Sequence, residues 1–385
     1  MKIGILTQRL FTNYGGLMQS LALQTVLENM GHNVMIFDRE YNDIEMFSYW
    51  IRLKRRLRKL CRDSYNLLCK KEKLSLNKRY IANEKYIRQN TDAFIAKYHH
   101  SSPKIYTKTD LKHSIEEWHV DAIVVGSDQV WRPIYSPMIS NYFLDFTEGW
   151  SIKRISYAAS FGVDEWEYTK KDTHVCSLLA KKFDAISVRE NSGIQLCKKY
   201  LGVDAIQTLD PTLLLDKDFY IDIVNKEKEP TINGGLFCYI LDNDCSKKSI
   251  INALSRKMRL NAFYCMPKSL LQETNMTMQE EDCVYPRPTQ WLRSFMDANM
   301  VITDSYHGLV FSLIFNKPFW IIVNKGRGEA RFNSILNLFD LKSRIIDLKN
   351  WNHIDWKEPI DWSKINGKRE KLKQYSISFL TQALS

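Results

Sequence analysis

His307 is the side chain whose type and position most strongly indicate chemistry in this sequence. It follows an apolar run over Met300–Thr303 and precedes a second apolar run over residues 308–314. The first run predicts a strand and the second a helix, with Asp304 and Ser305 in the turn between them. In open α/β sheets, ligands bind outside the carboxyl ends of the strands, and a helix that begins there attracts anions. We therefore expect His307 to contact an anionic ligand and to transfer a proton; a buried structural histidine is the alternative.

A second polar loop joins the first predicted strand to the helix that follows it. It contains Asn13, Tyr14, Gly15 and Gly16, and the two glycines would let a ligand approach the backbone closely. The loop is long and polar, which favours a binding role over the alternative of a tight turn with a helix cap. We expect these four residues to contact a ligand.

Two carboxylates also follow predicted strands. Asp128 is followed by Gln129 and Trp131. This combination suits sugar binding, because a carboxylate accepts hydrogen bonds from hydroxyl groups and an indole stacks on a sugar face. The alternative is that Asp128 caps the next helix. Asp210 precedes Pro211, and the sequence leaves open whether Asp210 lines a cleft or only fixes the turn.

Cationic side chains follow two further strand patterns. Arg189 comes directly after an apolar run, where its guanidinium could bind a phosphate or carboxylate bidentately; a salt bridge with Glu190 is the alternative. Lys325, Arg327 and Arg331 lie in a loop spaced by glycines after another strand pattern. Such a loop could grip an anion, or it could be an exposed turn.

Alternating strand and helix patterns predict an α/β protein with parallel sheets covered on both faces. We expect two Rossmann-like domains that face a cleft, over residues 1–225 and 231–362, joined by the charged, aperiodic segment 226–230. A helical, basic insertion over residues 42–115 interrupts the first domain, and a helix over residues 363–385 could pack back on that domain. The Gly-x-Gly-x-x-Gly fingerprint is absent, so dinucleotide binding is not predicted.

The formal net charge of +11 indicates anionic partners, and the densest basic segment is residues 51–62. Leu53, Leu57 and Leu60 recur in it at helical spacing. This pattern fits either an amphipathic helix on an anionic membrane surface or a solvated helix that packs through its leucines. No nucleic-acid recognition motif is present, so nucleic acid is not an expected partner.

The sequence also bounds the compartment and the metal chemistry. Its first residues enter a strand pattern directly, and no run of about 18 apolar residues occurs, so we expect a cytoplasmic protein that does not span a membrane. Attachment to the inner face of the cell membrane through residues 51–62 is left open. The eight cysteines include no Cys-x-x-Cys pair, and no ligand spacing of histidines and carboxylates occurs. We therefore predict reduced thiols and no metal site.

Five motifs, taken in order, resemble those of the polysaccharide pyruvyl transferase family. They are Asn13-Tyr14-Gly15-Gly16, Gly126-Ser127-Asp128-Gln129-Val130-Trp131, Arg189-Glu190, Asp210-Pro211-Thr212 and Thr303-Asp304-Ser305-Tyr306-His307-Gly308. The resemblance implies a fold similar to the GT-B glycosyltransferases. It also implies a reaction in which phosphoenolpyruvate places a pyruvate ketal on two hydroxyls of a sugar, without a metal or organic cofactor. The acceptor would be a surface polysaccharide, such as an exopolysaccharide or capsule, or its lipid-linked oligosaccharide precursor.

Under this resemblance the site residues divide into a donor side and an acceptor side. His307 would be the general acid or would hold the departing phosphate, and Asp128 would accept the proton of the attacking hydroxyl. Phosphoenolpyruvate carries about three negative charges, so cations should dominate the donor side. The donor side is expected to comprise Arg189, Ser305, His307, Lys325, Arg327 and Arg331. The acceptor side is expected to comprise Asn13, Tyr14, Gly15, Gly16, Asp128, Gln129 and Trp131.

One position departs from the family pattern. Some members have an arginine where this chain has Ser305, so the donor-binding cations would have to come from Arg189 and the loop that follows residue 323. Two other functions fit the same architecture. A nucleotide-sugar glycosyltransferase with the GT-B fold would share the cleft, and a non-catalytic saccharide-binding protein would not need His307.

Overall fold

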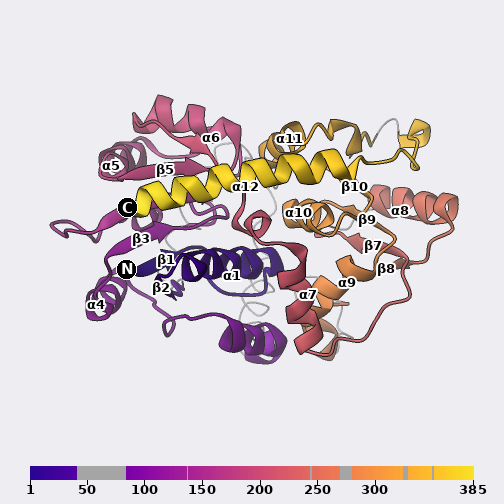
Figure 1. The fold of residues 1–385 in the computed structure, drawn as a ribbon, viewed down its shortest axis with the longest axis horizontal. Coiled ribbons are helices and arrows are strands. Elements are labelled where there is room, and N and C mark those ends of the chain that lie inside the picture. Colours follow the sequence, from indigo (N-terminus) through magenta and orange to yellow (C-terminus); the bar gives the residue numbers. More distant parts are fainter. Residues whose placement is uncertain (41–83, 137, 243–244, 269–279, 324–327, 349–350) are drawn as a thin grey trace, which may run out of the picture.

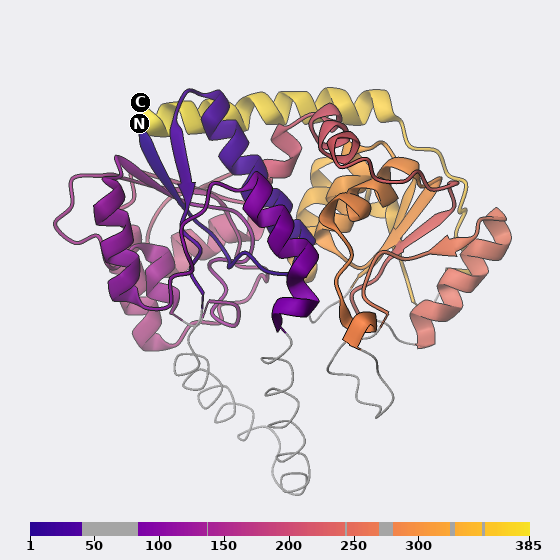
Figure 2. The same ribbon diagram turned by 90° about the horizontal axis from the view of Figure 1, so that it is seen from below.

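Two parallel α/β halves form the structure, a computed structural model that describes residues 1–40, 84–136, 138–242, 245–268, 280–323, 328–348 and 351–385. The halves lie side by side, each with its own sheet (Figures 1 and 2). This arrangement confirms the prediction of two Rossmann-like domains. Among the described residues, no helix is both long enough and apolar enough to span a bilayer.

The first half contains a parallel sheet of six strands in the order β2-β1-β3-β4-β5-β6. Its strands are β1 (Lys2–Leu6), β2 (Asn33–Ile36), β3 (Ala122–Val125), β4 (Lys153–Ala159), β5 (Ala185–Val188) and β6 (Ile206–Gln207). The central strands β1 and β3 are almost fully buried, as their continuous apolar runs predict. The strand order reverses between β1 and β3, which is where α/β sheets bind ligands.

The second half contains a parallel sheet of five strands in the order β11-β10-β9-β7-β8. Its strands are β7 (Leu236–Tyr239), β8 (Ala262–Phe263), β9 (Met300–Thr303), β10 (Phe319–Ile322) and β11 (Ile345–Ile346). The strand order reverses between β7 and β9, so the turn after β9, which leads to His307, lies at the corresponding point of this sheet.

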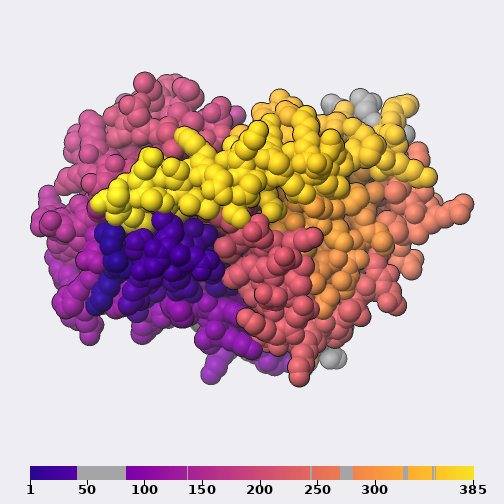
Figure 3. Space-filling model, viewed as in Figure 1, coloured from indigo at the N-terminus to yellow at the C-terminus, as the bar shows by residue number. Residues whose placement is uncertain are grey.

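Helices cover both sheets. The helices of the first half include α1 (Tyr14–Asn29), α4 (Lys108–Trp118), α5 (Lys170–Ala180) and α6 (Asn191–Leu196). Those that follow are α7 (Lys217–Lys226), α8 (Cys245–Met258), α9 (Pro288–Asp297), α10 (Tyr306–Ile314), α11 (Glu329–Leu338) and α12 (Trp362–Leu384). Helix α7 packs against α9 of the second half, and α12 runs along both halves (Figures 1 and 3).

The expected insertion over residues 42–115 is only partly within the described residues. Residues 84–98 are helical, as predicted. Beyond them the chain is extended, and Ser101 and Ile105 make isolated parallel bridges with Ile36 and Arg39. This short stretch is not helical and adds backbone hydrogen bonds beyond the edge strand β2.

The two halves share one apolar core. The largest cluster of buried side chains includes Ile3 and Leu21 of the first half together with Trp291 and Phe311 of the second. Near their boundary, the ring of Tyr14 in α1 lies 5.6 Å from that of Trp291, and the Tyr14 hydroxyl donates to the carbonyl of Pro286 at 2.8 Å. The halves are thus packed against each other through apolar contacts.

Helix α12 packs across the junction between the two halves. At its start Lys368 pairs with Asp340 of the second half at 3.2 Å. Toward its end, Leu380 and Leu384 join the shared core, and the hydroxyl of Ser376 accepts the N–H of Leu209 at 3.0 Å. One helix therefore contributes packing to both halves.

Because His99 is buried, we expect it to reduce the stability of the fold in acid. Its Nε2 lies 3.1 Å from the carbonyl of Leu17, and burial lowers the pKa of His99 from 6.5 to about 4. Between these values the unfolded chain binds a proton that the folded chain excludes, so His99 stabilises the fold less as pH falls. We expect the free energy of unfolding of the wild type, minus that of His99→Gln, to fall by roughly 3 kcal/mol from pH 7 to pH 4.

The subtraction is needed because Asp38 acts in the opposite direction. Burial raises the pKa of Asp38 from 3.8 to about 6, so the folded chain gains a proton first as pH falls, and this carboxyl stabilises the fold in acid. Denaturant titrations of both proteins at several pH values would remove the Asp38 contribution by difference. A difference that stays constant with pH would contradict the prediction.

Candidate active site

The predicted site residues meet where the two halves touch. Helix α1 of the first half and helix α10 of the second both begin at this point, and Gly15 in the first turn of α1 lies against the ring of His307 in the first turn of α10. A Cβ built on Gly15 would overlap Nδ1 of His307, so only glycine permits this approach. Two helix N-termini therefore flank the His307 imidazole, which favours negative charge on a ligand there.

Asp210 connects His307 to Arg189. Its Oδ2 accepts a hydrogen bond from Nη1 of Arg189 at 2.8 Å and lies 3.6 Å from Nε2 of His307. The second distance allows an ion pair but exceeds a hydrogen bond. All three residues are at least 95% buried. The structure thus joins a carboxylate and an arginine of the first half to a histidine of the second.

The guanidinium of Arg189 presents an unsatisfied edge in this junction. Nε and Nη2 are buried and make no hydrogen bond among the described residues, although Nη2 lies 3.5 Å from Oδ1 of Asp128. Buried polar groups without partners are rare in folded proteins, so these two donors call for an explanation such as a bound ligand. The Nε–Nη2 edge has the geometry that grips two oxygens of a carboxylate or phosphate.

The ring of Tyr306 lies near two buried guanidinium groups. Its ring centre lies 4.3 Å from Cζ of Arg189 and 5.5 Å from Cζ of Arg331, which comes from α11. Burial, and next the charge of Arg189, lower the pKa of Arg331 to about 10. The two positive charges are therefore held close together in a site where a bound anion would relieve their repulsion.

Asp210 remains ionised despite its burial. Burial alone would raise its pKa, but His307, Arg189 and Thr212 together hold the pKa of Asp210 well below its usual range. The carboxylate is fixed on both oxygens, since Oδ1 also accepts from the N–H and the hydroxyl of Thr212 at 3.1 and 2.7 Å. Asp210 is consequently an oriented negative charge that faces His307.

Asp128 lies at the end of β3 in an uncommon backbone conformation, with φ of +75°. Left-handed backbone in a residue other than glycine is strained and often marks a functional site. Its Oδ2 accepts from Nδ2 of Asn13 at 3.2 Å, and its Oδ1 accepts from the N–H of Gln129 at 2.9 Å. The structure therefore brings Asn13 and Asp128 together beside Arg189, whereas Gln129 lies next in the chain.

Two expected acceptor residues have other roles in the structure. Trp131 was expected to stack on a sugar, but it has no exposed surface and stacks on Phe143 with ring centres 4.9 Å apart. Tyr14 is 1% exposed and bonds to Pro286 across the junction. Both predictions are corrected for the same reason: these rings fill the apolar core and present no face to a ligand.

Some of the remaining predicted residues lie next to the junction, and others lie outside the described residues. Ser305 is the residue that precedes α10, next to Tyr306 and His307, whereas Asp304 accepts the N–H of Leu241 at 2.7 Å and holds the end of β7. Gly16 follows Gly15 in the first turn of α1. Lys325, Arg327 and the basic segment 51–62 lie outside the described residues.

Glu190 does not pair with Arg189. Its Oε1 accepts the N–H groups of Phe161 and Gly162 at 2.7 and 3.1 Å, which leaves Arg189 to Asp210 and Asp128. Within the described part of the chain, no group of three His, Cys, Asp or Glu side chains is arranged to hold a metal ion. The candidate site is therefore an arrangement of arginines, carboxylates and one imidazole.

Comparison with known families decides what kind of protein has this arrangement. The family model described as polysaccharide pyruvyl transferase matches residues 13–326, which include the described cluster up to α10. The chain belongs to the polysaccharide pyruvyl transferase family. None of the curated proteins matches the chain significantly. For this family member, the junction between the halves is thus the candidate active site of a transferase.

Solved structures support the fold of this family member. UDP-GlcNAc 2-epimerase from Methanocaldococcus jannaschii has a TM-score of 0.51 at 11% identity, over 99% of this chain and 100% of that one. Arabidopsis thaliana UGT89C1 complexed with UDP-L-rhamnose has a TM-score of 0.50 at 10% identity, over 98% of both chains. At these identities the likeness shows the fold alone, which is that of the GT-B glycosyltransferases and epimerases.

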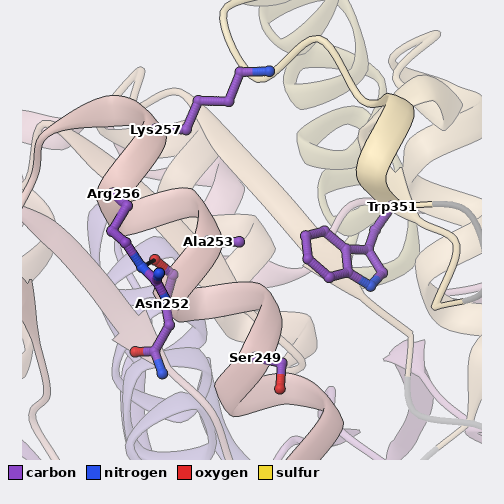
Figure 4. A pocket seen from close by; sticks show the side chains of 6 residues that line it. All are labelled: Ser249, Asn252, Ala253, Arg256, Lys257 and Trp351. Carbon is purple, nitrogen blue, oxygen red and sulfur yellow. Dashed lines mark hydrogen bonds between the residues drawn. The ribbon is translucent and has the colours of Figure 1, made fainter.

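A separate hollow of about 690 Å³ lies on the second half, between α8 and the segment at Trp351 (Figure 4). Arg256, Lys257 and Asn252 line it and are exposed on the surface of α8. None of the strand-end residues that define this family member's junction contributes to it. The hollow is therefore distinct from the candidate active site.

Sequence reasoning missed two side chains of the pyruvyl transferase site. Tyr306 was quoted in a motif but given no role, and Asp210 was left between a cleft residue and a turn residue. Asp210 does fix the turn, as the cap of the short helix η3 (Pro211–Leu214), and it also faces His307. A signal was present, because Asp210 follows a strand, as do Asp128 and Arg189.

Proposed function

We propose that this protein transfers the pyruvyl group of phosphoenolpyruvate to two hydroxyls of a sugar and forms a pyruvate ketal. The single observation that carries the proposal is the unsatisfied Nε–Nη2 edge of buried Arg189, which Asp210 links to the His307 imidazole at the start of α10. Such an edge suits the carboxylate or phosphate of this donor. Membership in the pyruvyl transferase family supports the same donor.

In this proposal the donor lies between Arg189 and Arg331, with one helix N-terminus on each side. Together these groups would offset most of the roughly three negative charges of phosphoenolpyruvate. The acceptor, a sugar or a lipid-linked oligosaccharide, would enter past Asn13, which is exposed. No metal or organic cofactor takes part in the proposed reaction.

The reaction consists of an addition and then a substitution at C2 of the donor. In the first, His307 protonates C3 while a sugar hydroxyl bonds to C2 and Asp128 accepts the hydroxyl proton. In the second, the neighbouring hydroxyl bonds to C2, the C2–O bond to phosphate breaks, and phosphate leaves with its electron pair. The products are the ketal and inorganic phosphate, and the second hydroxyl proton leaves with the phosphate or to water.

The first test is ligand-induced stabilisation. Phosphoenolpyruvate at about 100 times its Kd should stabilise the protein by about 2.7 kcal/mol, whereas inorganic phosphate, UDP and GDP should do so much less. A selective shift in Tm should be accompanied by release of phosphate that depends on both phosphoenolpyruvate and a saccharide. A shift with UDP or GDP alone would favour the nucleotide-sugar glycosyltransferase, and saccharide binding without phosphoenolpyruvate would favour a binding protein.

Replacement of Arg189 by lysine should weaken phosphoenolpyruvate binding about 10- to 100-fold. Lysine keeps the positive charge near Asp210 but lacks the two-pronged edge. Isothermal titration would measure the affinity. The matched control is Arg154→Lys, which lies on β4 and bonds to the carbonyls of Thr147 and Trp150 instead. Equal losses of affinity in the two variants would contradict the role of Arg189.

A further inference from the structure

We propose that Asp210 is a positioning residue that sets the protonated nitrogen of His307 from across the junction. The inference rests on the proposed function, because it concerns how His307 is prepared for proton transfer. Asp210 belongs to the first half and His307 to the second, and their facing atoms, Oδ2 and Nε2, lie 3.6 Å apart. Catalytic hydrogen bonds are often long without substrate and shorten when it binds.

The carboxylate of Asp210 has a fixed orientation. Oδ1 accepts both the N–H and the hydroxyl of Thr212, and Oδ2 accepts from Nη1 of Arg189 and from the hydroxyl of Ser127, at 2.8 and 3.2 Å. Four hydrogen bonds therefore hold the plane of the carboxylate. Rotation that would turn Oδ2 away from His307 would break all of them.

The ring of His307 is also restricted. Nε2 is buried and has no hydrogen-bond partner among the described residues, and the carboxylate of Asp210 faces it at 3.6 Å. Nδ1 lies against Gly15 at the start of α1. A carboxylate facing Nε2 favours a proton on that nitrogen and leaves Nδ1 as the nitrogen that can exchange a proton with a ligand.

The pairing of Asp210 with His307 depends on contact between the two halves. No element of the first half other than the one carrying Asp210 places a carboxylate within 4.0 Å of His307 in the described residues. If the halves separated, His307 would lose the group that orients it. The structure therefore couples the arrangement of the halves to the proton state of the imidazole.

Asp210→Asn tests this role because the amide has a predictable orientation. Thr212 donates two hydrogen bonds to Oδ1, one of them from its fixed backbone N–H, so the amide oxygen should stay there. Nδ2 should then face Nε2 of His307, and it cannot accept from Nη1 of Arg189 as Oδ2 does. An N–H donor in place of Oδ2 favours the proton on Nδ1 and excludes a second proton on Nε2, so the ring could give its proton to C3 only by becoming an imidazolate. We expect kcat to fall at least about 100-fold, a loss in turnover separate from any change in phosphoenolpyruvate affinity that follows from the lost hydrogen bond of Arg189.

The matched control is Asp38→Asn, the same change at another buried carboxylate, which accepts the N–H of Leu10 at 3.0 Å. It should keep the wild-type kcat. A merely structural role for Asp210 would lower Tm and phosphoenolpyruvate affinity together and leave the kcat of the folded fraction unchanged. That outcome would overturn the proposal.

A spectroscopic measurement avoids dependence on turnover. In protein labelled with ¹⁵N-histidine, the signals of His307 among the eight histidines can be assigned by their loss in His307→Gln. We expect Nε2 to carry the proton in the wild type and Nδ1 to carry it in Asp210→Asn. The same proton position in both proteins would refute the positioning role. A proton on Nδ1 in the wild type would also refute it, and that measurement does not require the variant to fold.

The proposed function and the positioning role of Asp210 can fail separately. If the wild type releases no phosphate from phosphoenolpyruvate with any acceptor but the histidine signals change as expected, the proposed function fails and the positioning of His307 by Asp210 stands. If the wild type is active and Asp210→Asn retains its kcat, the proposed function stands and the positioning role fails.

Discussion

Replacement of His307 by glutamine is expected to lower kcat by about 10²- to 10⁴-fold, the usual contribution of a positioned acid or base. His307 is the side chain that both halves of the molecule surround, with Asp210 on Nε2 and Gly15 against Nδ1. Glutamine keeps polar atoms near both places but cannot supply a proton at neutral pH. Single-turnover measurement of phosphate release would separate this loss from any change in donor binding.

The matched control for this variant is His99→Gln, which removes another buried histidine, outside the junction and bonded to Leu17 and Ser20. It should alter the pH dependence of stability and leave kcat unchanged. If His307→Gln instead unfolds at much lower denaturant concentration while its folded fraction turns over normally, His307 is a structural residue.

Alanine at position 15 should have a comparably large effect through packing alone. A Cβ on Gly15 would overlap Cβ, Cγ and Nδ1 of His307, and these atoms belong to a buried side chain that cannot rotate away easily. We expect a loss of about 1–3 kcal/mol in unfolding free energy from overpacking. We also expect a fall in kcat of more than about 100-fold, because displacement of the ring removes its proton from the reacting atoms.

Gly367→Ala is the control for the same chemical change. Gly367 lies within α12, and a Cβ there would meet no atom within 4 Å. Alanine favours helix over glycine, so this variant should be more stable by about 0.5–1 kcal/mol and fully active. Wild-type activity in Gly15→Ala would show that His307 is free to move and would argue against its role.

The fold was largely predictable because the strands are buried on both faces. Short continuous apolar runs such as Ala122–Val125 and Met300–Thr303 are typical of strands buried on both faces, and both form central strands. Strand ends then place polar residues at one edge of each sheet, so the roles of His307 and Arg189 as junction residues followed from position along the chain.

What failed depended on contacts between distant residues. Trp131 has the composition of a sugar platform, but only the fold reveals that Phe143 and the carbonyl of Tyr142 occupy its face and its N–H. Likewise Asp210 lies 97 positions before His307 in the sequence, a separation that follows from their numbers and that no local pattern can bridge. The hydrophobic periodicity of the sequence shows which side of a helix or strand is apolar. It does not show which distant residues pack against that side.

The position of α12 has a consequence for how the chain is made. Ribosomes release the first half early, and domains generally fold in that order. Here, however, Leu380 and Leu384 belong to the same core as Ile3 and Leu21, and Ser376 satisfies the N–H of Leu209. Part of the apolar core of the nascent first half is therefore exposed until residues 376–384 have been synthesised. A chaperone that shields this exposed patch would be needed for longer than the length of that half suggests.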